Sequence, residues 1–156
     1  MLFRSEVVLS RLAHLTPAEA RVFLRVIPVF LPVDAAALVP LDRVPVVESI
    51  DAQVGRLPRA ARALLSQALG AFDHAAIPLG GGLTRAVNLD DAALHDWLVD
   101  WSRGNELFRA GFGAIKQLVA LGYFGSPPAW PPLEYDGPVT DPKGIPRLGH
   151  QPLPEV

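Results

Sequence analysis

Proline is concentrated at one end of this chain, and that distribution limits the possible folds more than any other feature. Nine of the 16 prolines in the 156-residue sequence fall in the last 30 residues. Proline lacks a backbone N–H and its ring clashes with the preceding helical turn, so this end can form neither a regular helix nor a central β-strand. We therefore predict a helical domain over residues 1–125 and an extended proline-rich tail over residues 126–156.

Capping signals and apolar periodicity predict the first helices of the domain. The run Thr16–Glu19 is a capping box with proline at the first helical position, and the helix that it starts is expected to end at Pro28. A short helix around residues 5–13 is expected to precede it. Residues 46–54 are predicted to form the next helix, closed by Gly55.

Three further segments have the apolar spacing of helices. Pro58 opens the first, Asn88 or Asp90 caps the second, and the third covers residues 105–121 and is expected to stop at Gly122. No strand-like alternation extends beyond a few residues, so we predict an all-α domain of four to six helices. The residues that we expect to face the core are Ala61, Leu64, Leu65, Ala68, Leu69 and Phe72 in the first segment, Leu94, Trp97, Leu98 and Trp101 in the second, and Phe108, Gly111, Phe112, Ile115, Leu118 and Val119 in the third.

Charge and composition exclude several classes of function. The formal net charge is −2 and no basic stripe is present, which argues against nucleic acid as the main partner. Without cysteine, the chain has no disulfides and no thiolate metal ligands. The most apolar stretch, residues 26–41, is shorter than the roughly 20 residues of a membrane helix and is interrupted by three prolines, so we predict no membrane span. The N-terminus has no recognisable export signal, which favours a cytoplasmic location.

One cluster of side chains has a metal-binding pattern. Asp91 and His95 are four residues apart, as are Asp96 and Asp100, so each pair shares a helical face. Carboxylate and imidazole groups at this spacing bind divalent metal ions. No second cluster supplies the remaining ligands, so we interpret these residues as a solvated acidic face and predict no metal site, no cofactor and no catalytic residue in this chain.

The start of the tail is rich in aromatic residues. Four of the 16 residues from Tyr123 to Pro138 are aromatic, and prolines separate them. Proline restricts the unfolded chain, so a proline-rich segment loses less entropy when it docks. Aromatic residues are the usual energetic centres of interfaces. We interpret the segment as a strap whose rings enter pockets, either on its own domain or, as we favour, on a partner subunit.

Three segments in this order are similar to a known family. They are Val46–Leu69, Trp97–Gly122, and the run that contains Tyr123, Phe124, Trp130, Tyr135, Asp136, Gly137 and Pro138. Over roughly residues 15–138 the chain resembles the small (gamma) subunit of gluconate 2-dehydrogenase, known as subunit 3. Many members of that family carry a twin-arginine export signal, so the resemblance makes a periplasmic or membrane-associated location the alternative.

The resemblance implies a partner and no reaction of this chain's own. Members accompany a large catalytic flavoprotein of the glucose–methanol–choline type, which binds FAD and oxidises an alcohol group, and a cytochrome subunit is a further partner in such complexes. We expect a permanent heterodimer or a higher assembly; the alternatives are a transient folding or export chaperone and an independent metal-dependent enzyme using Asp91, His95 and Asp100. The residues that we expect to contact the partner are Tyr123, Phe124, Trp130, Leu133, Tyr135, Asp136 and Pro138.

Overall fold

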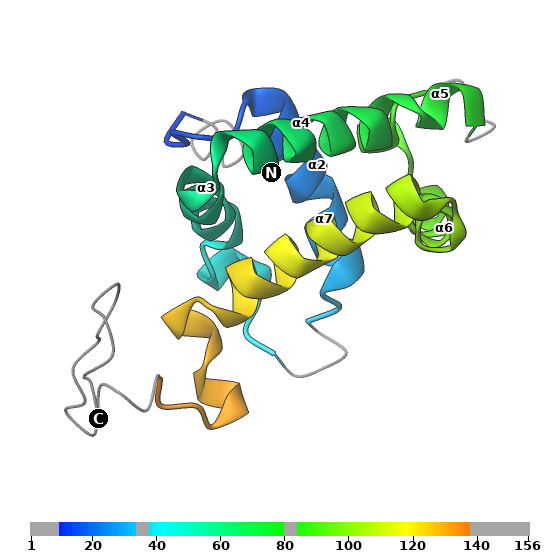
Figure 1. Ribbon diagram of the computed structural model, residues 1–156. Coiled ribbons are helices and arrows are strands. Elements are labelled where there is room, and N and C mark those ends of the chain that lie inside the picture. The colour runs from blue at the N-terminus through cyan, green and yellow to red at the C-terminus, as the bar shows by residue number, and fades with distance from the viewer. Residues whose placement is uncertain (1–9, 34–37, 80–83, 138–156) are drawn as a thin grey trace, which may run out of the picture.

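Helices are the regular elements in the part of the chain that the structure describes. The structure is a computed structural model, and it describes residues 10–33, 38–79 and 84–137 (Figure 1). It contains no strand within those residues, which confirms the predicted all-α class. The elements are α2 (Pro17–Phe30), η1 (Leu41–Arg43), α3 (Val46–Arg56), α4 (Arg59–His74), α5 (Ala76–Leu79), η2 (Ala86–Asn88), α6 (Asp91–Arg103), α7 (Glu106–Phe124), η3 (Pro127–Ala129) and η4 (Pro131–Leu133), where η denotes a 3-10 helix.

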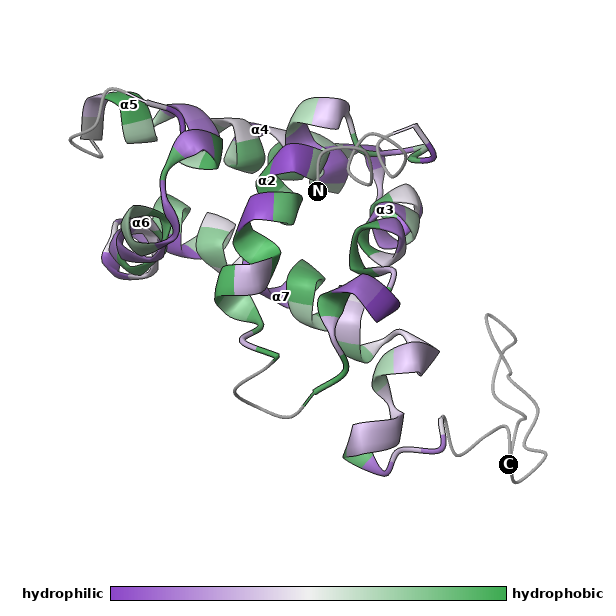
Figure 2. Ribbon diagram, turned by 180° about the vertical axis from the view of Figure 1, so that it is seen from behind, coloured by the Kyte–Doolittle hydropathy of each residue, from purple (hydrophilic) through white to green (hydrophobic). Residues whose placement is uncertain are grey.

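The longest helix, α7, lies at the centre of the arrangement and contacts α2, α3, α4 and α6. Figure 1 shows α3 near one end of α7 and α6 near the other, with α4 running across from one to the other. Helix α2 crosses behind this layer in Figure 1 and in front of it in Figure 2, which is seen from the opposite side. The core therefore lies between α2 and the layer that α4 and α7 form.

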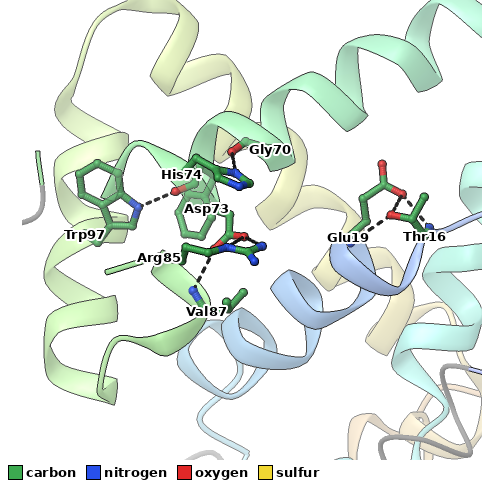
Figure 3. Close-up of polar contacts among 9 residues, drawn as sticks. Thr16, Glu19, Gly70, Asp73, His74, Arg85, Val87 and Trp97 are labelled. Carbon is green, nitrogen blue, oxygen red and sulfur yellow. Dashed lines mark hydrogen bonds and ion pairs between the residues drawn. The ribbon is translucent and has the colours of Figure 1, made fainter. Parts of the chain in front are cut away.

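The predicted starts of α2, α6 and α7 are confirmed. The backbone N–H of Glu19 donates to Thr16 Oγ1 at 3.3 Å, and the N–H of Thr16 donates to Glu19 Oε2 at 2.8 Å (Figure 3). Asp90 and Asn105 cap α6 and α7 by accepting an N–H three residues further on, at 2.8 and 3.0 Å. These caps satisfy N–H groups that have no partner inside the helix.

The predicted end of α2 at Pro28 is wrong, because the helix continues to Phe30. A proline in the last turn costs one backbone hydrogen bond, and the next bond of the helix is intact: the N–H of Leu31 donates to the carbonyl of Ile27 at 2.9 Å. Ile27 and the residues before it on the same face are buried, so packing keeps this last turn helical.

The predicted stop at Gly122 is also wrong. Gly122 lies inside α7, which ends at Phe124. A Cβ added at Gly122 would lie 2.8 Å from Ile50 Cγ1 and 3.0 Å from the carbonyl oxygen of Val46. Glycine is therefore present at this position because it lets α3 pack closely against α7, and not because it ends the helix.

The helix expected around residues 5–13 does not appear in the described residues 10–13, and a buried carboxylate explains why. Asp51 on α3 accepts the backbone N–H groups of Ala13, His14 and Leu15 at 3.0, 2.9 and 2.7 Å. Burial alone would raise the pKa of Asp51, but these N–H groups and the charge of His14 outweigh it and hold the pKa below its usual value. This carboxylate fixes the approach of the chain to α2.

A second buried carboxylate, Asp73 near the end of α4, holds the segment that leads into η2. It forms an ion pair with Arg85, whose Nε lies 2.8 Å from Asp73 Oδ2, and it accepts the N–H of Val87 at 3.1 Å (Figure 3). Close by, the indole N–H of Trp97 donates to the carbonyl of Phe72 at 3.0 Å. Asp51 and Asp73 thus have structural partners, and both serve to position the chain.

Candidate partner-binding site

The structure divides the predicted tail residues into two groups. Tyr123 is fully buried, and its hydroxyl donates to the carbonyl of Val39 at 2.7 Å. It is a core residue here and has no exposed surface, unlike the other described residues predicted to contact a partner. The signal for its burial was its spacing: it follows Ile115 and Val119 at intervals of four residues on the buried face of α7.

Four other large apolar residues of this region form an exposed cluster, which we call the tail patch: Phe124, Trp130, Leu133 and Tyr135. The ring centroids of Trp130 and Tyr135 lie 5.0 Å apart, and the indole N–H of Trp130 donates to the carbonyl of Phe124 at 2.8 Å. Trp130 is half-buried, whereas Phe124, Leu133 and Tyr135 are 40–46% exposed. Asp136 is exposed beside the patch, and Pro138 lies outside the described residues.

The described part of the tail is not extended; η3 contacts the end of α7, and η4 contacts η3 (Figure 1). Residues 127–129 and 131–133 form two 3-10 turns, because the φ angle that proline imposes fits a 3-10 helix as well as an extended chain. Ser126 anchors them: its hydroxyl donates to the carbonyl of Gly122 at 2.7 Å and lies 2.8 Å from the hydroxyl of Ser49 on α3. Glu134 then adopts a left-handed conformation (φ 51°) that returns Tyr135 to Trp130.

A larger apolar surface, which we call the groove, lies between α4 and α7. It has a volume of about 780 Å³ and is lined mostly by leucine and alanine, with Trp101 and Phe108 at the α6 end. Leu64, Leu107 and Leu121 line it with 66%, 72% and 48% of their surfaces exposed. Large leucine side chains with such exposure around one concavity are typical of a site that another molecule covers.

Arg56 is the single charged side chain among the described residues that line the groove. It lies at the α3 end, and it forms no ion pair within residues 10–33, 38–79 and 84–137. The remaining polar lining consists of glutamine side chains from α3, α4 and α7. The groove is therefore an apolar trough with one cation at one end.

The sequence predicted the apolar stripe of α4, but it did not predict that one part of the stripe is buried in the core and the other part faces the groove. Leu65, Leu69 and Phe72 are buried as expected, whereas Leu64 is mostly exposed and Ala61 and Ala68 face the groove. The width of the stripe was the sequence signal for this second surface, because a surface helix needs an apolar stripe of only about 100° to pack on the core of its domain. An apolar face wider than that is a sign of a second contact surface.

The residues of the predicted acidic face, Asp91, His95, Asp96 and Asp100, all lie on α6. Among the described residues, no group of three or more His, Asp or Glu side chains comes together in a way that could hold a metal ion. Asp91 forms an ion pair with Arg25 at 3.2 Å, and His95 lies 3.4 Å from Asp96. These partners are consistent with the interpretation of a solvated face.

Within residues 10–33, 38–79 and 84–137, no helix has the length and apolar character needed to cross a membrane. Comparison of the chain with protein-family models, with curated proteins and with solved structures finds no match.

Proposed function

We propose that this chain is the non-catalytic small subunit of a heteromeric FAD-dependent sugar or alcohol dehydrogenase, and that it stabilises or matures the large flavoprotein subunit. The identity of the partner comes from the resemblance to gluconate 2-dehydrogenase subunit 3. FAD belongs to the partner in this proposal, and no catalytic residue is assigned to this chain.

The groove is the observation that best supports a partner-binding role. Burying apolar surface yields roughly 25 cal/mol per Å², so three exposed leucines around one concavity are stabilised when a partner covers them. The tail patch adds a second exposed apolar surface at the end of α7. Trp and Tyr, two of its members, are among the residue types that contribute most to binding energy.

The direct test is co-expression with a flavoprotein of the glucose–methanol–choline type encoded beside this chain. We expect the two chains to purify together in fixed stoichiometry with FAD bound, and we expect the yield of active flavoprotein to fall when the small chain is omitted. A flavoprotein that is equally soluble, FAD-loaded and active without this chain, and that never purifies with it, would refute the proposal.

The alternative, a transient chaperone of the flavoprotein, predicts a different composition of the final enzyme. Mass analysis of the purified active complex separates the two functions, because a permanent subunit is present in stoichiometric amount. In the same complex, Leu133→Glu combined with Tyr135→Ser tests the tail patch. Ile77→Glu is the matched control, since Ile77 is a 37% exposed apolar residue on α5, outside both surfaces.

A further inference from the structure

We propose that the groove binds one amphipathic helix of the partner subunit, about four turns long, with a carboxylate at the end that meets Arg56. This inference rests on the proposed function, because it names the element of the partner that this chain recognises. Three properties of the groove support it: its length, the size of the side chains that line it, and its charge.

The length of the groove suits a helix of about 14 residues. Leu107 and Leu121, which both line it, are 14 residues apart on α7, and this spacing corresponds to about 21 Å at 1.5 Å per residue. On α4 the lining runs from Ala61 to Ala71. A four-turn helix laid along the groove would contact α7 over its whole length and α4 over about 15 Å of it.

Small residues form the walls of the groove and leucines stand at its edges. Alanine or glycine occupies positions 61, 68 and 71 on α4 and 110, 111 and 114 on α7. Such short side chains leave room for the larger side chains of a third helix to pack between α4 and α7. A helix about 10 Å wide would also cover Leu64 and Leu107, whereas a single acyl chain on the floor of the groove would leave these side chains in water.

Charge and shape distinguish a partner helix from a second copy of this chain. The described lining contains Arg56 and no carboxylate, so the best occupant supplies an acidic group at that end. A second copy would present the same concave surface with the same cation, which complements neither shape nor charge. The proline-rich tail of this chain cannot supply a regular four-turn helix.

The test uses the full chain and a fluorescent synthetic peptide of 16 residues that carries leucines at helical spacing and glutamate in its first and last turns. Matched peptides replace glutamate with lysine, or keep the composition and scramble the leucine positions. We expect the glutamate peptide to bind best, as measured by fluorescence anisotropy. Leu64→Glu and Leu107→Glu should each weaken binding roughly tenfold or more, because each removes one buried leucine contact.

Two further variants complete this test. Arg56→Glu should reverse the preference, so that the lysine peptide binds better than the glutamate peptide. Ile77→Glu should leave both affinities unchanged, and circular dichroism with thermal melting confirms that each variant is folded. Equal binding of the scrambled peptide, no binding up to about 1 mM, or displacement of the leucine peptide by hexadecanoate would overturn the proposal. A wild-type dimer that Leu64→Glu converts to monomer would overturn it in favour of self-association.

The same variants in the co-expressed complex separate this inference from the proposed function. If the flavoprotein purifies with the wild-type chain and equally well with the combined Leu64→Glu and Leu107→Glu variant, the groove is not the helix-binding site, although the subunit assignment stands. If the chain binds the leucine peptide as described but never purifies with a flavoprotein, the helix-binding groove stands and the subunit assignment is wrong.

Discussion

Two glycines on α7 give the sharpest test of how closely α3 packs against α7. A Cβ at Gly113 would meet no atom within 4 Å, so Gly113→Ala should simply gain helix propensity and stabilise the chain by about 0.5–1 kcal/mol. At Gly122 the same substitution places a methyl group 2.8 Å from Ile50 Cγ1 and 3.0 Å from the Val46 carbonyl oxygen. Ile50 is fully buried and the carbonyl belongs to helical backbone, so neither can move away easily.

Overpacking of this kind costs about 1–3 kcal/mol, and the gain in helix propensity offsets part of it. We therefore expect Gly122→Ala to destabilise the chain by about 1–2 kcal/mol. In a chain of this length 1 kcal/mol corresponds to about 2–4 °C, so the Tm should rise by about 1–4 °C in Gly113→Ala and fall by about 2–8 °C in Gly122→Ala. Thermal melting followed by circular dichroism measures both. A rise in Tm for Gly122→Ala would show that α3 does not pack closely against α7 at this residue.

Three further predictions concern the buried polar groups. Tyr123→Phe removes the hydroxyl that bonds the Val39 carbonyl and should cost about 1–2 kcal/mol in urea denaturation, with no change in the m-value. Asp51→Ala leaves three N–H groups without their acceptor and should cost about 2–4 kcal/mol, whereas Asp100→Ala at an exposed position should change stability by less than about 0.5 kcal/mol. Burial raises the pKa values of Asp51 and Glu19, but their hydrogen bonds outweigh burial and lower both pKa values. The two ionised carboxylates therefore stabilise the fold at neutral pH. This stabilisation is lost as the pH falls below the ordinary carboxyl pKa values of about 4. Asp51→Asn should reduce the loss of stability at acid pH, whereas Tyr123→Phe should leave that loss unchanged. An unchanged acid transition in Asp51→Asn would contradict the role of that carboxylate.

Local signals predicted the beginnings of the helices better than their ends. Thr16, Asp90 and Asn105 act within a few residues of their own position, so their capping role can be read from the sequence alone. The ends near Pro28 and Gly122 depend on which helix lies opposite, and that information is not local. Tertiary packing extended both helices beyond residues that usually stop them.

The same limit applies to the candidate site. Periodicity identified the apolar face of α4, but it does not distinguish a leucine that packs in the core of the domain from one that remains exposed. Leu64 and Leu65 are adjacent and chemically identical, yet they are 66% and 7% exposed. For the tail, proline content excluded a regular helix, but the choice between an extended chain and 3-10 turns depended on the anchoring of Ser126 to α3 and α7.

Helix α7 carries both exposed apolar surfaces, with Leu107 near its beginning and Phe124 at its end. The groove reaches Leu121, three residues before Phe124, so at 1.5 Å per residue the two surfaces are about 4.5 Å apart along the axis of α7. A partner that engages both surfaces would do so bivalently, because the first contact raises the effective concentration of the second. Two individually weak contacts would then produce a long-lived assembly, and inserting one residue in α7 between them would turn one surface by about 100° relative to the other and abolish that advantage.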